Sequence, residues 1–147
     1  MSIYIHKSHN VSVLLYHLVT PIKYRKKMLS EPVVSRINEV VLEIQDRYEI
    51  YFIEVGCDAD HIHFLIQSVP IIAPQKIAQI VKSIIAREIF KSFPELKKEL
   101  WGAEFFTKGY FINTVGRAGN EKTILNYVKS QGVEKDYKTL LSQPTLF

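Results

Sequence analysis

Two stretches of the chain repeat their hydrophobic residues at the three- and four-residue spacing of an amphipathic helix. The first begins after Ser30, a residue type that favours the N-cap position. The second begins at Pro74, since proline suits the first turn of a helix, and is limited by Pro94. The apolar stripes are Val33, Ile37, Val40, Val41, Ile44 and Tyr48 in the first helix, and Ile77, Ile80, Val81, Ile84, Ile85 and Phe90 in the second.

Four other stretches have the β-rich or alternating pattern of strands: "NVSVLLYHLVT", ended by Pro21, "YEIYFIEVG", "HIHFLIQSV" and "GYFINTVG". The middle two are separated only by a short polar turn, which predicts a hairpin. The complete order is β-α-β-β-α-β. It predicts an α+β fold, a ferredoxin-like sandwich in which an antiparallel sheet has both helices on one face and leaves the other face open.

Length and composition fit a single domain, expected to span residues 1–147. No apolar run approaches the roughly 20 residues that a membrane span needs, and the first residues lack the features of a secretory signal. The lone Cys57 cannot form an internal disulfide, which agrees with a cytoplasmic location. The formal charge of +4 is a mild excess that favours a polyanionic partner, although a solvated surface explains it equally well.

The stretch "DADHIHFLIQSVP" places His61 and His63 two residues apart within an apolar strand. Strand residues i and i+2 share a face, so both imidazoles point one way while Ile62, Phe64 and Ile66 point the other. Two neutral imidazoles at this spacing can bind one metal ion. A pair of half-buried, hydrogen-bonded histidines is the alternative interpretation of the motif alone.

After the fourth predicted strand, "GRAGN" can act as a flexible connector to a final helix, "EKTILNYVKSQ", which Gly132 closes. Tyr127 and Gln131 lie four residues apart, and therefore on one face of that helix. Taken alone, Tyr127 fits ordinary packing of an amphipathic aromatic residue.

The stretches "YHLVTPIKYRKKML", "DADHIHFLIQSVP", "FPELKKELWGAEFFTKGYFINTVG" and "ILNYVKSQG" together resemble the small single-tyrosine transposases of bacterial and archaeal insertion sequences, the IS200-like branch of the HUH endonucleases. The resemblance covers a core of about residues 10–132 and leaves the tail, 133–147, unassigned. The motifs agree in order and spacing as well as in residue type.

The resemblance implies a transposase that cleaves and rejoins single-stranded DNA through a 5′-phosphotyrosine intermediate. Tyr127 matches the nucleophile, and His61, His63 and Gln131 match the metal ligands. Imidazoles suit Mn²⁺, Co²⁺ or Zn²⁺ better than Mg²⁺, whereas the family is associated with Mg²⁺ or Mn²⁺, and these two are the metals we expect. His17 and Asp60 are candidates for the base that accepts the phenol proton, and Asp60 can instead orient a histidine ligand or cap the hairpin turn.

The resemblance also implies partners: DNA hairpins at the ends of the element, and a second copy of the chain, with the tyrosine helix serving the partner's metal site. Two rival classes stay open, a non-catalytic single-stranded nucleic-acid-binding module and an HUH enzyme with another task, such as a replication initiator, a relaxase or a domesticated processor of genomic repeats. The expected DNA contacts are basic or aromatic residues that can meet phosphates or stack on bases. They are Lys23, Tyr24, Arg25, Lys26, Lys27, Lys82, Arg87, Lys108 and Arg117.

Overall fold

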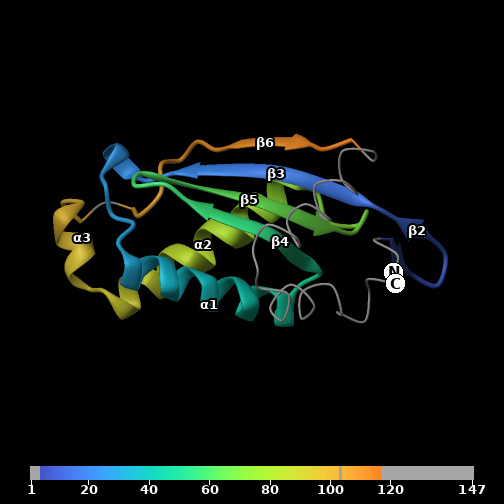
Figure 1. Ribbon diagram of the computed structural model, residues 1–147, viewed down its shortest axis with the longest axis horizontal. Helices are drawn as coiled ribbons and strands as arrows, with labels where there is room; N and C mark the ends of the chain where they lie inside the picture. Colours follow the sequence, from blue (N-terminus) through green and yellow to red (C-terminus); the bar gives the residue numbers. More distant parts are fainter. Residues whose placement is uncertain (1–3, 103, 117–147) are drawn as a thin grey trace.

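A computed structural model describes residues 4–102 and 104–116 of the chain (Figure 1). The strands are β1 (Ile5–His6), β2 (Val11–Ser12), β3 (Leu14–Pro21), β4 (Ile50–Cys57), β5 (His61–Ser68) and β6 (Phe111–Thr114). The helices are α1 (Glu31–Arg47), α2 (Pro74–Ser92) and the short α3 (Glu95–Glu99), with a tight helical turn, η1, at Lys23–Arg25. In this described part of the chain, no helix is long and apolar enough to cross a bilayer.

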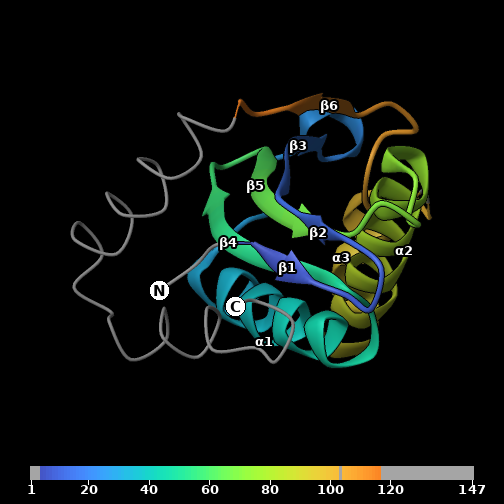
Figure 2. The same cartoon turned by 90° about the vertical axis from the view of Figure 1, so that its right-hand side faces the viewer.

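The main sheet has the order β4-β5-β3-β6, and each neighbouring pair is antiparallel. Both long helices lie on the same side of it (Figures 1 and 2). The chain order β3-α1-β4-β5-α2-β6 with this strand order is the ferredoxin-like sandwich, so the predicted α+β fold is confirmed. The final helix predicted to carry Tyr127 lies outside the described residues.

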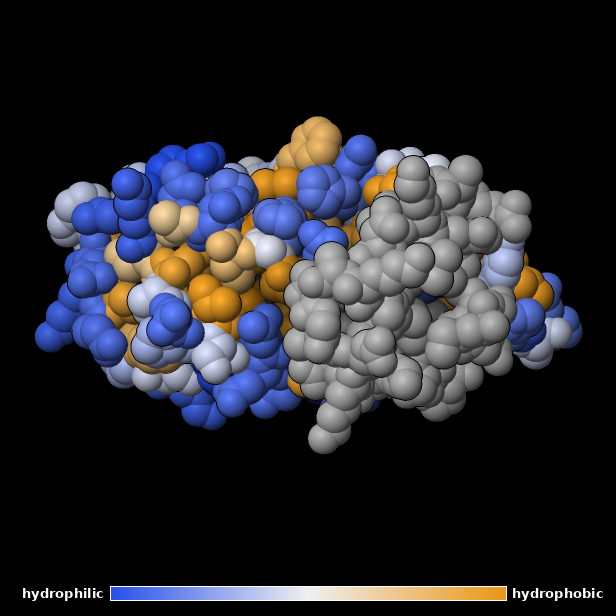
Figure 3. Space-filling view, in the orientation of Figure 1, coloured by the Kyte–Doolittle hydropathy of each residue, from blue (hydrophilic) through white to orange (hydrophobic). Residues whose placement is uncertain are grey.

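The core between helices and sheet forms from the residues that the periodicity marked. Val33, Ile37 and Ile44 of α1 pack in one buried cluster with Ile77, Val81 and Ile85 of α2 and with Ile62, Phe64 and Ile66 of β5. Ser30 occupies the N-cap position of α1 as predicted, but its side chain makes no capping hydrogen bond. Burial of the apolar stripe, rather than a strong cap, therefore holds α1 in place. In the space-filling view, hydrophobic residues of the described part of the chain are visible at the surface between hydrophilic ones (Figure 3).

The opposite face of the sheet is only partly open, which corrects the prediction of an uncovered face. The first predicted strand splits in two, because β2 pairs with β1 in a separate small sheet and β3 joins the main one. Ile5 of β1 then packs with Leu15, Tyr51, Ile53 and Leu65 in a second buried cluster. These apolar side chains project from the face without helices, and the N-terminal segment keeps them from water.

A β-bulge in β4 changes which residues face that side. Phe52 pairs with Ile66, but the next pair is Glu54 with Leu65, so Ile53 is the extra residue. Beyond the bulge, the register of β4 shifts by one relative to β5. Gly56 is consequently the residue directly opposite His63.

Candidate active site

The two histidines of β5 lie on the sheet face that carries no helices, near the end that the N-terminal segment leaves exposed. Their rings have centroids 6.4 Å apart, and the His61 side chain retains 28% of its exposure. His17 of β3 is on the same face, with its ring 5.9 Å from that of His63 in an edge-to-face arrangement. Asn113 of β6 pairs with His17 across the sheet and adds an exposed amide. The structure thus brings His17 to the predicted histidine pair.

His63 lies across the backbone of Gly56. A Cβ atom at position 56 would lie 3.0 Å from Cδ2 of His63 and closer still to Cε1 and Nε2. Carbon atoms in van der Waals contact stay about 3.5–4.0 Å apart, so no other residue leaves room for this ring position. Without the bulge, Val55 would occupy the place opposite His63 and exclude its ring. Bulge and glycine together set the direction of this imidazole.

His61 is held at both ring nitrogens. Its Nδ1 lies 3.0 Å from Oδ1 of Asp60, and its Nε2 lies 2.8 Å from Oδ2 of Asp58. The Asp58 amide donates to the carbonyl of His61 at 2.9 Å, which closes the β4–β5 turn and brings both carboxylates to the ring. Asp58 was missed in the sequence, although its three-residue spacing from His61 across a tight turn is the signal that could have identified it.

Asp60 connects His61 to the basic turn η1. Its Oδ2 accepts a hydrogen bond from Nε of Arg25 at 3.1 Å. The hydrogen bond from His61 and then that from Arg25 hold the pKa of the Asp60 carboxyl below its usual value, despite opposing desolvation. An anionic Asp60 at Nδ1 favours a proton on that nitrogen, and a ligand at Nε2 would have to replace the contact with Asp58. Of the three functions predicted for Asp60, histidine orientation therefore has geometric support.

The described residues contain two of the predicted metal ligands, His61 and His63. Among them, no group of three or more His, Cys, Asp or Glu side chains is arranged to hold a metal ion. The histidine pair fits a divalent cation as two nitrogen donors, with Asp58 already beside the His61 nitrogen that would bind it. The other predicted site residues, Gln131 and Tyr127, lie outside the described residues, so their position relative to the pair stays a prediction.

The predicted DNA contacts fall on two separate surfaces. Lys23, Tyr24, Arg25, Lys26 and Lys27 surround η1, next to Asp60 and His61. Arg117 lies outside the described residues.

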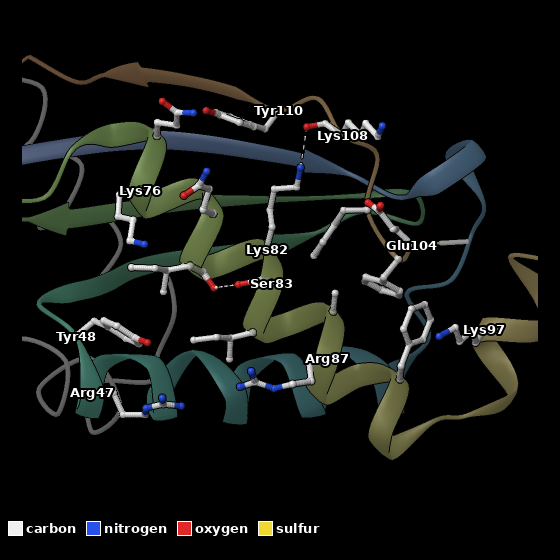
Figure 4. A pocket seen from close by; sticks show the side chains of 18 of the residues that line it. Arg47, Tyr48, Lys76, Lys82, Ser83, Arg87, Lys97, Glu104, Lys108 and Tyr110 are labelled. Atoms are coloured by element: carbon white, nitrogen blue, oxygen red, sulfur yellow. Dashed lines mark hydrogen bonds between the residues drawn. The ribbon is translucent and has the colours of Figure 1, made fainter. Parts of the chain in front are cut away.

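Arg87 and Lys108 line a groove of about 910 Å³ (Figure 4). Its walls come from α1, α2, α3, Gly102 and residues 104–110, and from none of the strands that carry the histidines. Lys82 lies there too, but Nζ donates to the carbonyls of Thr107 and Lys108 at 2.7 and 3.0 Å. These two hydrogen bonds join α2 to the segment before β6. Burial lowers the pKa of the Lys82 ammonium group. The described residues that line the groove include one carboxylate, Glu104, and six cations: Arg47, Lys76, Lys82, Arg87, Lys97 and Lys108.

The ferredoxin-like sheet carries the predicted pair of histidines, separated by one hydrophobic residue, on its strand β5. Comparison with known proteins identifies the family. The family model described as "Transposase IS200 like" matches residues 10–131. The chain therefore belongs to the IS200-like transposase family, as predicted, and its function is that of a transposase.

Relatives support the same assignment. The ISDra2 transposase TnpA of Deinococcus radiodurans is 30% identical over 118 residues, 80% of this chain and 84% of that protein. The IS200 transposase of Salmonella typhimurium is 27% identical over 129 residues, covering 88% and 84%. A crystal structure of a candidate transposase from Deinococcus radiodurans R1 superposes with a TM-score of 0.70 at 25% identity, covering 86% of this chain and 96% of that one. A REP-associated tyrosine transposase bound to a REP hairpin shares the fold, with a TM-score of 0.50 at 7% identity over 95% and 79%.

Proposed function

We propose that this transposase cleaves and rejoins single-stranded DNA at hairpin-bearing element ends through a covalent bond to Tyr127. The observation that carries the proposal is the histidine pair on the exposed part of the sheet face, with Nδ1 of His61 bonded to Asp60, in a chain of this family.

The proposed reaction is a transesterification. The phenol oxygen of Tyr127 forms a bond to the scissile phosphorus, and the bond from phosphorus to the 3′ oxygen breaks. The phenol proton passes to a base, and the departing 3′ oxygen takes up a proton to become a hydroxyl. Because the phosphotyrosine ester conserves the energy of the phosphodiester, a second 3′-hydroxyl can displace the tyrosine without ATP.

His17 suits the role of base better than Asp60. Asp60 already accepts hydrogen bonds from Arg25 and His61, which commits it to positioning. His17 stands beside His63 on the same sheet face.

We propose Mg²⁺ or Mn²⁺ as the metal, held by His61, His63 and Gln131. A divalent cation there would neutralise charge on the scissile phosphate and leave phosphorus open to attack. The protein's own contribution is orientation: Asp60 fixes the His61 ring, and Gly56 gives the His63 ring its place.

A DNA hairpin and a second copy of the chain are the proposed partners. The REP-associated transposase of the same fold was solved with a hairpin bound, which supports a folded-back single strand as substrate here. We further propose that the chain acts as a dimer in which Tyr127 of one subunit serves the histidines of the other.

The test is adduct formation. Full-length protein incubated with Mn²⁺ and single-stranded DNA from the element end should give a protein–DNA species that survives detergent, and peptide mapping should place the DNA on Tyr127. Tyr127→Phe should bind the hairpin but form no adduct, while Tyr110→Phe, the same change at a different tyrosine, should react normally. Attachment at another residue would overturn the assignment, and hairpin binding without any adduct would favour the non-catalytic binding module.

A further inference from the structure

Two exposed aromatic side chains meet beside η1. Tyr24 and Trp101 are 54% and 73% exposed, and their ring centroids lie 5.3 Å apart in an edge-to-face arrangement. We call this pair the aromatic platform. Nζ of Lys26 lies 4.7 Å from the centroid of the Trp101 ring, and Nζ of Lys23 lies 5.6 Å from that of Tyr24. Large aromatic surface and positive charge thus occur together on one solvent-facing spot.

Distant parts of the chain are joined to build the platform. Ile22 and Phe106 form a β-bridge, and the Lys23 amide donates to the Phe105 carbonyl at 2.8 Å. This short pairing aligns the segment after β3 with the segment after α3. Tyr24 follows the first of these paired segments and Trp101 precedes the second, so the pairing helps to bring the two rings together.

Backbone conformation at the platform is unfavourable for the residues found there. Among the described residues, only three that are not glycine have positive φ: Tyr24 at 59°, Arg25 at 53° and Trp101 at 53°. Trp101 stands where α3 ends in a Schellman motif, its amide bonded to the Lys98 carbonyl and that of Gly102 to the Lys97 carbonyl. Glycine is the usual residue at that position because a Cβ atom is disfavoured there. Such conformations concentrate at functional sites, where another requirement selects the side chain.

The platform is connected to the histidine pair. Arg25, which follows Tyr24, donates from Nε to Asp60, and Asp60 contacts Nδ1 of His61. A strand lying on the platform would therefore pass close to the proposed metal ligands.

We propose that Tyr24 and Trp101 form a stacking site for an unpaired base of the single strand, which holds the DNA next to the scissile phosphate. An aromatic ring stacks on any base, and the lysines beside both rings can meet the flanking phosphates. Placement next to the scissile phosphate rests on the proposed function. Base stacking at the platform stands on the contacts described above.

Trp101 is the only tryptophan in the chain, so its fluorescence reports on the platform directly. The probe is an oligodeoxythymidylate of about twelve nucleotides, within the range of known single-strand sites. An abasic oligonucleotide of equal length keeps the phosphates and lacks bases. We expect thymidylate to quench Trp101 in a saturable way, and the abasic strand to bind without comparable quenching.

Substitutions test the rings separately. Tyr24→Asn and Trp101→Asn remove an aromatic ring but keep a residue type that tolerates positive φ. Each should weaken thymidylate binding by about fivefold to a hundredfold, measured by anisotropy of a labelled strand. Tyr24→Phe should bind like the wild type. Tyr110→Asn, which removes an exposed tyrosine from beside Lys82, should leave the quenching at saturation unchanged.

Binding of thymidylate without quenching, equal quenching by the abasic strand, or unchanged affinity in both asparagine variants would overturn the proposal. Quenching that follows protein concentration rather than DNA concentration would also overturn it, because the platform would then be a contact between copies. A Tyr127 adduct without Trp101 quenching would refute the stacking site alone. Quenching without any adduct would refute the proposed cleavage alone.

Discussion

Replacing Gly56 by alanine should separate the position of His63 from the stability of the fold. The new methyl group would lie 3.0 Å from Cδ2 of His63 and closer to two further ring atoms, so the imidazole must leave its place. The ring is the mobile end of a half-buried side chain, and the backbone of Gly56 is outside the positive-φ region. The fold can therefore accept the change.

Opposing terms keep the expected stability effect small. A change from glycine to alanine stabilises by about 0.4–1 kcal/mol at a compatible position, because the unfolded chain loses freedom. Moving His63 off its preferred rotamer costs about 0.5–1.5 kcal/mol. The free energy of unfolding should change by less than about 1 kcal/mol.

The effect on the proposed metal site should be much larger. Disturbing a residue that orients a metal ligand lowers affinity or activity by about 10–100-fold, and we expect a loss of that size for Mn²⁺ binding measured by calorimetry. Gly109→Ala is the matched control, since a Cβ atom there has nothing within 4 Å. His63→Ala sets the value for complete loss of the ligand. Wild-type Mn²⁺ affinity in Gly56→Ala would refute the argument that this glycine positions His63.

Two more predictions concern assembly and pH. If the two subunits of a symmetric dimer share their active sites, an equal mixture of inactive His63→Ala and Tyr127→Phe chains should regain about a quarter of wild-type cleavage. A mixture of His63→Ala with His61→Ala should regain none. If mixed dimers are shown to form and no cleavage returns, the shared-site model is refuted. Burial, and then Asp58, raise the pKa of the Cys57 thiol from 9.0 to about 11, so a thiol reagent at pH 8 should label the native chain about a hundredfold more slowly than the unfolded chain. Because the folded chain keeps the thiol proton to a higher pH than the unfolded chain, the contribution of Cys57 to stability should be constant below pH 9 and fall between about pH 9 and 11. Cys57→Ser should abolish this fall. Equal labelling rates of native and unfolded protein would contradict the raised pKa.

Periodicity predicted the layers of the fold because it records which side chains must be buried together. The stripe containing Val33 and Ile37 and the alternation through Ile62 and Phe64 both meet in the same core. The N-terminal pairing of β1 with β2 was missed, since two-residue strands leave almost no pattern. The bulge at Ile53 was also missed, because a single extra residue is specified by pairing with β5 and not by the sequence of β4.

In the candidate site too, features set by local strand geometry could be predicted from the sequence, and features set by contacts between distant segments could not. His61 and His63 could be found because strand geometry fixes their common face. The contact between Trp101 and Tyr24 could not be predicted from the sequence, since the segments that carry them are brought together by a bridge between Ile22 and Phe106. Whether Tyr127 reaches the histidines stays a prediction, because that residue lies outside the described part.

The turn between β4 and β5 explains how the exposed end of the sheet can hold a defined ligand geometry. Its backbone closes on itself through Asp58 and His61, and the Asp60 carbonyl accepts the Ile22 amide at 2.8 Å. The Asp60 side chain meanwhile binds Arg25 and His61, so one residue links the turn, the basic segment and the proposed ligand. The bulge acts from the other side, since it places Gly56 and not Val55 beneath His63. The two imidazoles are thus oriented by independent means, and a substitution at Gly56 should disturb His63 while leaving the contacts of His61 intact.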